Sequence, residues 1–144
     1  MTPIPTIHGC AVLIGETGVL IRGPSGAGKS TLVLALIEAA NARGLFARLV
    51  ADDRVRLVAA SGRLIALPHP AIAGLIEERG HGILERPHED SARIGLIVDL
   101  AASPDRLPEP QEARMSLEGI ELPRLSLPAD LPLASATRRI LGFF

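Results

Sequence analysis

Short apolar runs separated by turn residues dominate the first half of the chain. Residues 4–14 and 18–22 are two such runs joined by a three-residue turn, a pattern typical of a β-hairpin. Residues 31–42 (TLVLALIEAANA) predict a helix, with Gly44 as its stop signal. The next run, LFARLVADD, predicts a strand that ends in two acids.

The second half of the chain continues in the same style. The stretch RVRLVAASGRLIAL predicts a hairpin that turns at Ser61-Gly62, and ARIGLIVDL predicts a buried strand. The remaining predictions are a short helix near 70–78, a Pro-rich loop over 101–112, two short strands in ARMSLEGIELPRLSL and a final helix in LPLASATRRILGFF. The order predicts an α/β fold, with a mixed sheet, hairpins and flanking helices.

Composition narrows the class of protein. A length of 144 residues with 47% hydrophobic residues is enough for one domain, and we expect a single domain over residues 1–144. One cysteine, Cys10, and no evident secretory signal or membrane span favour the cytoplasm. A net charge of −1, with three Phe and neither Tyr nor Trp, gives no case for binding nucleic acid or an anionic membrane.

The glycine-rich stretch GPSGAGKS, residues 23–30, matches the full pattern of a phosphate-binding loop. Glycines let successive backbone N–H groups converge on phosphate oxygens, and the helix that follows adds its positive end. Lys29, the only lysine of the chain, would reach the β- and γ-phosphates, and the Ser30 hydroxyl would bind Mg²⁺. A turn that merely caps a helix is the weaker explanation, because strand, loop and helix follow in the required order.

Phosphoryl transfer also needs a carboxylate near the metal and a group that orients or deprotonates the acceptor. Two predicted strands end in acids, one in Asp52 and Asp53 and the other in Asp99. Asp99 is the neater single acid, whereas the adjacent pair could divide the two roles, and crowding of like charges suits a general base. An Asp at a strand end is usually a turn residue, so the residues alone favour the pair only slightly.

Three other positions have open interpretations. His8 precedes the hairpin that leads into the glycine-rich loop, and alone it is better read as a histidine satisfied at a strand end. Glu77, Glu78 and Arg79 precede a Gly-His-Gly segment and fit either a metal or acceptor site or a solvated helix end. Arg106 is an ordinary loop arginine unless it points at a phosphate.

Taken together, these segments resemble the catalytic domain of HPr kinase/phosphorylase, which phosphorylates a serine of the small phosphocarrier protein HPr. The resemblance covers about residues 6 to 128. It rests on five segments in order: IHG, GVLIRGPSGAGKS, LVADDRV, IEERGHGILE and DRL. The order is specific, above all ADDRV followed by ERGHGI.

The resemblance assigns a role to each matching position. It implies that Ser30 and Glu77 bind Mg²⁺ and that Asp53, beside Asp52, takes the proton of the acceptor serine. His8 would tune that acid, and Arg106 would face the transferring phosphate. The ATP-binding residues would be those of the loop: Gly23, Pro24, Ser25, Gly26, Ala27, Gly28, Lys29 and Ser30.

The chain also departs from the family pattern. It resembles the short, single-domain members found in some proteobacteria, without the separate N-terminal domain of longer members. Where a Gly-Arg-Asn segment tied to reverse phosphorolysis should follow LPRLSLP, the chain reads ADLPLASATRR, so we expect little phosphorolysis. The family's hexamers imply a homo-oligomer.

Two alternatives compete with a kinase that acts on HPr. One is a P-loop kinase of a small metabolite, for which residues 79–93 supply the arginines of a lid. The other is an ATP-binding sensor without transfer activity. A GTPase switch is excluded because its Asn-Lys-x-Asp reader needs a lysine other than Lys29, and an ABC-type ATPase because the Ser-Gly-Gly signature is missing.

Overall fold

The structure, a computed structural model, describes residues 4–101 and 113–144. In that part of the chain, nine strands form one mixed sheet, and β7 (Leu75–Glu78) and β8 (Gly82–Glu85) form a separate hairpin. The main path runs β1-β5-β6-β9-β3-β2-β4, and β11 joins β9 and β10. The strands are β1 (Thr6–His8), β2 (Cys10–Ile14), β3 (Thr17–Arg22), β4 (Ala47–Ala51), β5 (Arg54–Ala60), β6 (Arg63–Pro68), β9 (Ala92–Ala101), β10 (Arg114–Leu117) and β11 (Ile120–Pro128).

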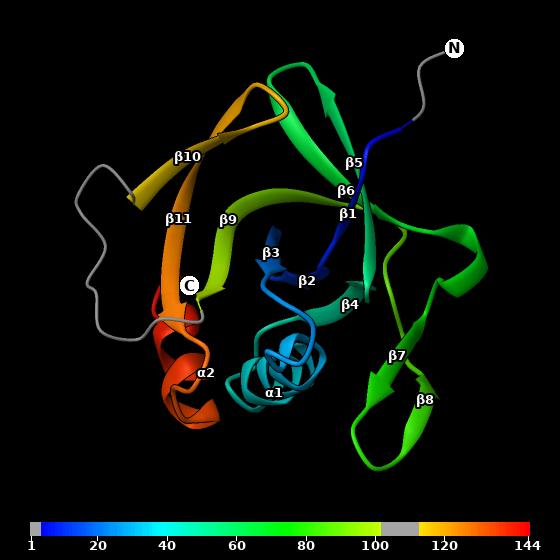
Figure 1. The fold of residues 1–144 in the computed structure, drawn as a ribbon, viewed down its shortest axis with the longest axis vertical. Coiled ribbons are helices and arrows are strands. Elements are labelled where there is room, and N and C mark those ends of the chain that lie inside the picture. The colour runs from blue at the N-terminus through cyan, green and yellow to red at the C-terminus, as the bar shows by residue number, and fades with distance from the viewer. Residues whose placement is uncertain (1–3, 102–112) are drawn as a thin grey trace.

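The two helices cover one face of this sheet (Figure 1). α1 (Lys29–Ala42) and α2 (Leu133–Leu141) lie side by side and pack on the core that also takes side chains from β2, β3 and β9. A second apolar core on the opposite face gathers side chains from β3, β5, β6 and β9, such as Leu20, Leu57 and Ile97. Buried side chains on both faces explain why β3 and β9 are almost continuously apolar.

Four strands point the same way and bring their carboxyl ends to one edge of the sheet. β3 and β9 are parallel, as are β9 and β11, and β4 runs in the same direction as β3 because both are antiparallel to β2. The residues that follow β3 and β4 are the glycine-rich loop and the Asp52-Asp53 pair. The topology therefore gathers the predicted site residues at the edge where α/β sheets commonly bind ligands.

The predicted α/β class, mixed sheet, hairpins and flanking helices are confirmed, and two local predictions are wrong. The run 4–14 is not one hairpin arm: it breaks at Gly9 into β1 and β2, and a Cβ at Gly9 would meet the Ile21 carbonyl oxygen at 2.7 Å. The predicted helix near 70–78 is only a 3₁₀ turn over Pro70–Ile72, followed by β7. Gly74, with a φ of 79°, stops the helix, so Glu77 and Glu78 lie on a strand rather than at a helix end.

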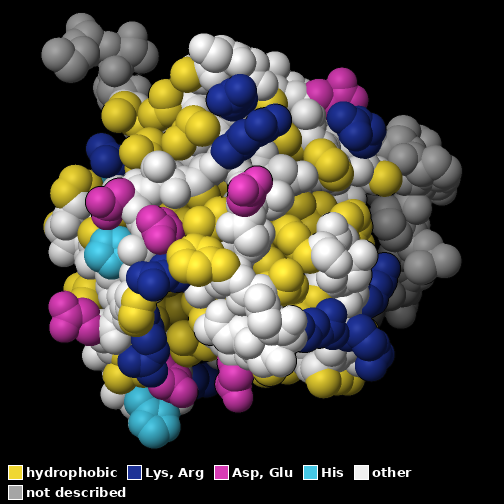
Figure 2. Space-filling model, turned by 180° about the vertical axis from the view of Figure 1, so that it is seen from behind, with side chains coloured by type: hydrophobic (Ala, Val, Ile, Leu, Met, Phe, Trp, Pro, Cys, Tyr) yellow, Lys and Arg dark blue, Asp and Glu magenta, His cyan; other side chains and the backbone are white. Residues whose placement is uncertain are grey.

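Charged side chains of both signs are spread over the face seen in Figure 2, where Lys and Arg form several separate groups with Asp and Glu between them. In the two described segments, no helix is long and apolar enough to cross a membrane. The 101–112 loop falls almost entirely outside the described residues, and so does Arg106.

Candidate nucleotide and acceptor site

The glycine-rich loop links β3 to α1, and its residues Ser25, Gly26 and Gly28 line a depression at the surface. Gly26 and Gly28 have φ values of 85° and 88°, a region that side chains rarely tolerate. A Cβ built on either glycine would meet no atom within 4 Å. The backbone is therefore bent for phosphate approach, and the space beside it is free.

No side chain caps the backbone N–H groups at the beginning of α1. Gly28 is the N-cap residue and offers no side-chain cap, and the first turn holds no acidic residue. The first N–H groups of a helix lack intrahelical acceptors, and the helix dipole adds positive potential there. A phosphate group fits this terminus in both hydrogen bonding and charge.

Lys29 lies folded into the loop. Its Nζ donates hydrogen bonds to the carbonyl oxygens of Gly23 at 2.8 Å and Pro24 at 3.0 Å, and the residue is 7% exposed. The ammonium group is thus held against the backbone at the beginning of the loop. A flexible four-carbon stem allows it to exchange these carbonyls for phosphate oxygens.

Asp52 connects three elements around Ser30. Its Oδ1 accepts hydrogen bonds from the Ser30 hydroxyl at 2.6 Å and from the Cys10 thiol at 3.0 Å. Its Oδ2 accepts one from the backbone N–H of Glu77 at 3.0 Å. The buried carboxylate and the serine hydroxyl together form a set of hard oxygen donors of the type that suits Mg²⁺.

Cys10 also lines the site, although no sequence pattern marks it as a site residue. It begins β2, and burial, followed by the Asp52 carboxylate, raises the pKa of its thiol to about 12. The thiol therefore stays protonated at neutral pH and acts as a donor to Asp52. The antiparallel pairing of β2 with β3 places Cys10 opposite Ile21, near the edge of the sheet where the loop begins. A single cysteine has no sequence pattern from which this position could be predicted.

Asp53 is exposed to solvent, whereas the adjacent Asp52 is buried. Its Oδ1 lies 3.0 Å from His8 Nε2, and the two side chains are 57% and 60% exposed. Its φ of 70° is unusual for a residue other than glycine, although Asp tolerates it better than most. Adjacent acids thus have different neighbours, one buried beside Ser30 and one exposed beside His8.

A depression of about 310 Å³ is lined by most of these groups, Asp52 excepted. The loop residues Gly26 and Gly28 line it, and so do His8 and Asp53. Glu77 and Arg79, at the end of β7, also line it. The fold therefore brings together His8, Lys29, Ser30, Asp53 and Glu77, which are far apart in sequence.

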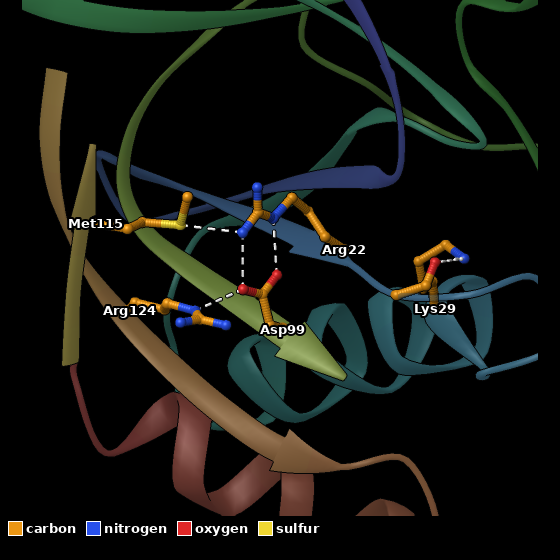
Figure 3. A network of polar contacts seen from close by, with 6 residues as sticks. Arg22, Lys29, Asp99, Met115 and Arg124 are labelled. Carbon is orange, nitrogen blue, oxygen red and sulfur yellow. Dashed lines mark hydrogen bonds and ion pairs between the residues drawn. The ribbon is translucent and has the colours of Figure 1, made fainter. Parts of the chain in front are cut away.

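Asp99 belongs to a different cluster (Figure 3). Arg22 donates to both of its carboxylate oxygens at 2.7 Å, Arg124 donates to Oδ2 at 2.6 Å, and Arg22 also reaches the Met115 sulfur at 3.0 Å. Burial alone would raise the pKa of Asp99, but the two guanidinium groups outweigh it and lower that pKa. Lys29 lies apart from this cluster, at the beginning of α1.

With this geometry in view, the comparison with known families is direct. A sequence profile of the HPr serine kinase C-terminal domain matches residues 1–131. The chain belongs to that family. The sequence resemblance to HPr kinase/phosphorylase is thereby confirmed at the level of the family.

Individual HPr kinases agree with this family assignment. The HPr kinase/phosphorylase of Geobacillus thermodenitrificans is 36% identical over 146 residues, which cover 89% of this chain and 43% of that protein. The enzyme of the same name from Streptococcus thermophilus is 35% identical over 136 residues, 85% of this chain and 42% of that protein. The chain thus spans less than half the length of these curated relatives.

A solved structure supports the fold as well. The Hpr(Ser) kinase/phosphatase from Coxiella burnetii superposes with a TM-score of 0.78 at 26% sequence identity. The match covers 96% of this chain and 95% of that one. The P-loop kinase fold of the HPr kinase type, expected from the sequence, is therefore confirmed.

Proposed function

We propose that this chain transfers the terminal phosphate of ATP to a serine hydroxyl of the phosphocarrier protein HPr. The observation that supports this most directly is the shared depression, which both the phosphate loop and the His8–Asp53 pair line. A phosphate donor and a base for an acceptor hydroxyl are the two parts that such a transfer needs. The choice of HPr as the acceptor rests on the relatives, which are named as HPr kinases.

In this proposal Asp53 accepts the proton of the serine hydroxyl as the new O–P bond forms. The bond between the γ-phosphorus and its bridging oxygen breaks, and ADP leaves with that oxygen. His8, 3.0 Å from the Asp53 carboxylate, orients it toward the acceptor. Lys29 holds the phosphates after it leaves the Gly23 and Pro24 carbonyls.

Mg²⁺ would be held by Ser30 and Glu77, with Asp52 beside the serine as a further oxygen donor. The ion would neutralise phosphate charge. Arg106 keeps its proposed role opposite the transferring phosphate, although it lies outside the described residues. Asp53 and His8 are more than half exposed, which suits an acceptor serine on a protein surface.

The proposal has four further parts. We propose the cytoplasm as the location, one domain over residues 1–144 and a homo-oligomer, a hexamer by resemblance.

We also propose that reverse phosphorolysis is weak. Residues 129–139 bring only apolar side chains to the depression beside the loop, and their arginines lie in the last turn of α2. Incubation of serine-phosphorylated HPr with inorganic phosphate should release little pyrophosphate, and rapid release would contradict this point.

The deciding experiment follows label from γ-labelled ATP, with Mg²⁺, to HPr and to HPr whose acceptor serine is alanine. Label on the first protein and not on the second is expected. Lys29→Ala should abolish the transfer, because Lys29 is the cation of the loop, while thermal unfolding shows that the variant folds. No label on either protein, with ATP still bound, would redirect the search to a small-molecule acceptor or a sensor.

A further inference from the structure

A bulge between β2 and β4 sets the position of Cys10 relative to the acidic pair. The register of the two strands shifts between Ala11 and Val12, and after the shift Ala11 pairs with Ala51. Had the earlier register continued, Cys10 would lie opposite Ala51. With the shift, Cys10 comes opposite Asp52, the residue that follows β4. Bulges re-aim side chains in this way and are common beside active sites.

The same bulge turns Asp52 toward the helices. Val50 and Ala51 both pack in the core on the face opposite the helices, although successive side chains of a regular strand alternate between faces. The Asp52 carboxylate then reaches Ser30 on α1, and Cys10 belongs to the core on that same side of the sheet. Residues opposite each other on antiparallel strands present their side chains to one face. The thiol therefore meets the carboxylate, with 3.0 Å between the Cys10 Sγ and the Asp52 Oδ1.

The other two donors to Asp52 come from the residues that we assign to Mg²⁺. Ser30 donates its hydroxyl proton to Oδ1 at 2.6 Å, which leaves the lone pairs of its oxygen for a cation. Glu77 donates its backbone N–H to Oδ2 at 3.0 Å, which holds β7 where the Glu77 side chain lines the depression. One carboxylate thus fixes both residues, and Asp52 bears on the metal through them as well as through its own oxygens.

The Cys10 thiol supplies the third hydrogen bond to this carboxylate. The last torsion of an aspartate side chain is soft, so a carboxylate with two partners can still tilt. Asp52 is 7% exposed, and a buried charge depends on protein donors because water reaches it poorly. A thiol is a weak donor, but a charged acceptor strengthens the bond. Cys10, which is fully buried, therefore restrains the orientation of Asp52 from within the core.

We propose that Cys10 is a positioning residue of the phosphate-transfer site: its thiol keeps the Asp52 carboxylate in the orientation that presents the Ser30 hydroxyl and the Glu77 strand to Mg²⁺. The inference rests on the proposed function. In this role the thiol acts only through Asp52 and takes no part in the transfer itself. It adds to the site a residue from β2 that belongs neither to the phosphate loop nor to the acids.

The test uses three substitutions of Cys10 in the full chain. Cys10→Ala removes the donor, Cys10→Val removes it while filling the space, and Cys10→Ser keeps a donor at the same position. Val12→Ala is the matched control, because Val12 is a fully buried residue of the same strand and the same core. Thermal unfolding verifies that each variant folds and ranks the structural cost of each change.

The first measurement needs neither metal nor nucleotide. Amide exchange by NMR reports the hydrogen bond from the Glu77 N–H to Asp52. We expect exchange at Glu77 to be about fivefold faster in Cys10→Ala and Cys10→Val, a change typical of one weakened hydrogen bond to a charged group. Cys10→Ser and Val12→Ala should stay close to the unaltered chain. Unchanged exchange in both donor-free variants would overturn the inference.

The second measurement is ATP affinity by titration calorimetry, once with Mg²⁺ and once with EDTA. With Mg²⁺, Cys10→Ala and Cys10→Val should bind ATP about fivefold more weakly than the unaltered chain, and Cys10→Ser should restore the affinity. With EDTA all variants should bind alike, because the phosphate loop does not depend on Asp52. Equal losses in Val12→Ala, equal losses with EDTA, or no recovery in Cys10→Ser would show that Cys10 serves only packing.

Failure of this inference and failure of the proposed function are separable, because neither measurement uses HPr. A chain that labels HPr while both donor-free variants behave like the unaltered chain would overturn the positioning role alone. A chain that shows the expected changes but transfers no phosphate to HPr would overturn the acceptor alone and leave the role of Cys10 in place.

Discussion

The regions around Asp53 and Asp99 share a sequence pattern, an aspartate after an apolar run, but the two carboxylates have different surroundings in the structure. Asp53 lies just beyond the end of β4 and Asp99 lies two residues before the end of β9, and both strands are apolar and point to the same edge of the sheet. Asp99 is fixed by Arg22 and Arg124, which satisfy both of its oxygens. Asp53 is exposed, and within the described residues its carboxylate pairs with His8 alone. The difference shows that the neighbouring strands, rather than the local pattern, decide which carboxylate is available for chemistry.

The sharpest test of this comparison is Asp53→Asn. We expect it to lower phosphate transfer to HPr by about 10²-fold or more while ATP affinity is kept, because it removes a base and not a phosphate ligand. Asp90→Asn is the matched control, since Asp90 is an exposed acid 3.2 Å from His88 and does not line the depression. Unchanged transfer by Asp53→Asn would return Asp99 to consideration.

Asp99→Asn should give the opposite result, with transfer affected less than stability. Removing the charge leaves Arg22 and Arg124 facing each other, which we expect to lower the free energy of unfolding by about 1–3 kcal/mol in urea titrations. Glu121→Gln breaks the exposed pair with Arg114 and should cost at most about 1 kcal/mol. Equal effects of the two variants would show that the Asp99 cluster has no special role.

The pH dependence of stability should separate the two regions as well. The pKa of Asp99 is lowered in the folded chain, so its contribution is present above the ordinary value of 3.8 and is lost as the pH falls through the folded value. Urea midpoints of the unaltered chain should therefore fall more steeply below about pH 4 than those of Asp99→Asn. Parallel midpoint curves would contradict the lowered pKa.

The smallest expected effect is on the reactivity of the Cys10 thiol, which donates a hydrogen bond to Asp52. Because the pKa of Cys10 is raised to about 12 and the residue is fully buried, iodoacetamide at pH 8 should modify it slowly in the folded chain and rapidly in urea. The neutral thiol stabilises the fold below its ordinary value of 9.0, and this stabilisation is lost as the pH rises toward 12. Mass spectrometry gives the labelling rates, and fast labelling of the folded chain would contradict the buried donor.

Local signals were enough to predict much of this fold. The glycine-rich loop, the helix after it and the hairpin at Ser61-Gly62 all depend on residues close together in the chain, and each was found. The predicted helix near 70–78 failed because a single glycine, Gly74, ended it after one turn. Short apolar runs of this kind do not distinguish helix from strand.

The arrangement of side chains within the site could be predicted less well from the sequence. The adjacent acids could be proposed from their spacing, but their different orientations depend on Ser30, Cys10 and His8, which reach them only through sheet registers. The arginines that fix Asp99 come from strands β3 and β11, 77 and 25 residues away in sequence. Pairing over such separations leaves no mark on local composition.

The many partners of β9 also affect when this chain can fold during its synthesis. One side of the strand pairs with β3, while its beginning pairs with β6 and its end pairs with β11 as far as Pro128. The sheet cannot close until the ribosome has released the last of these strands. Until then one edge of β9, a long and mostly apolar strand, stays unpaired in the nascent chain. Such an edge can pair with other chains and promote aggregation. Chaperone dependence should therefore end abruptly once the chain extends past β11.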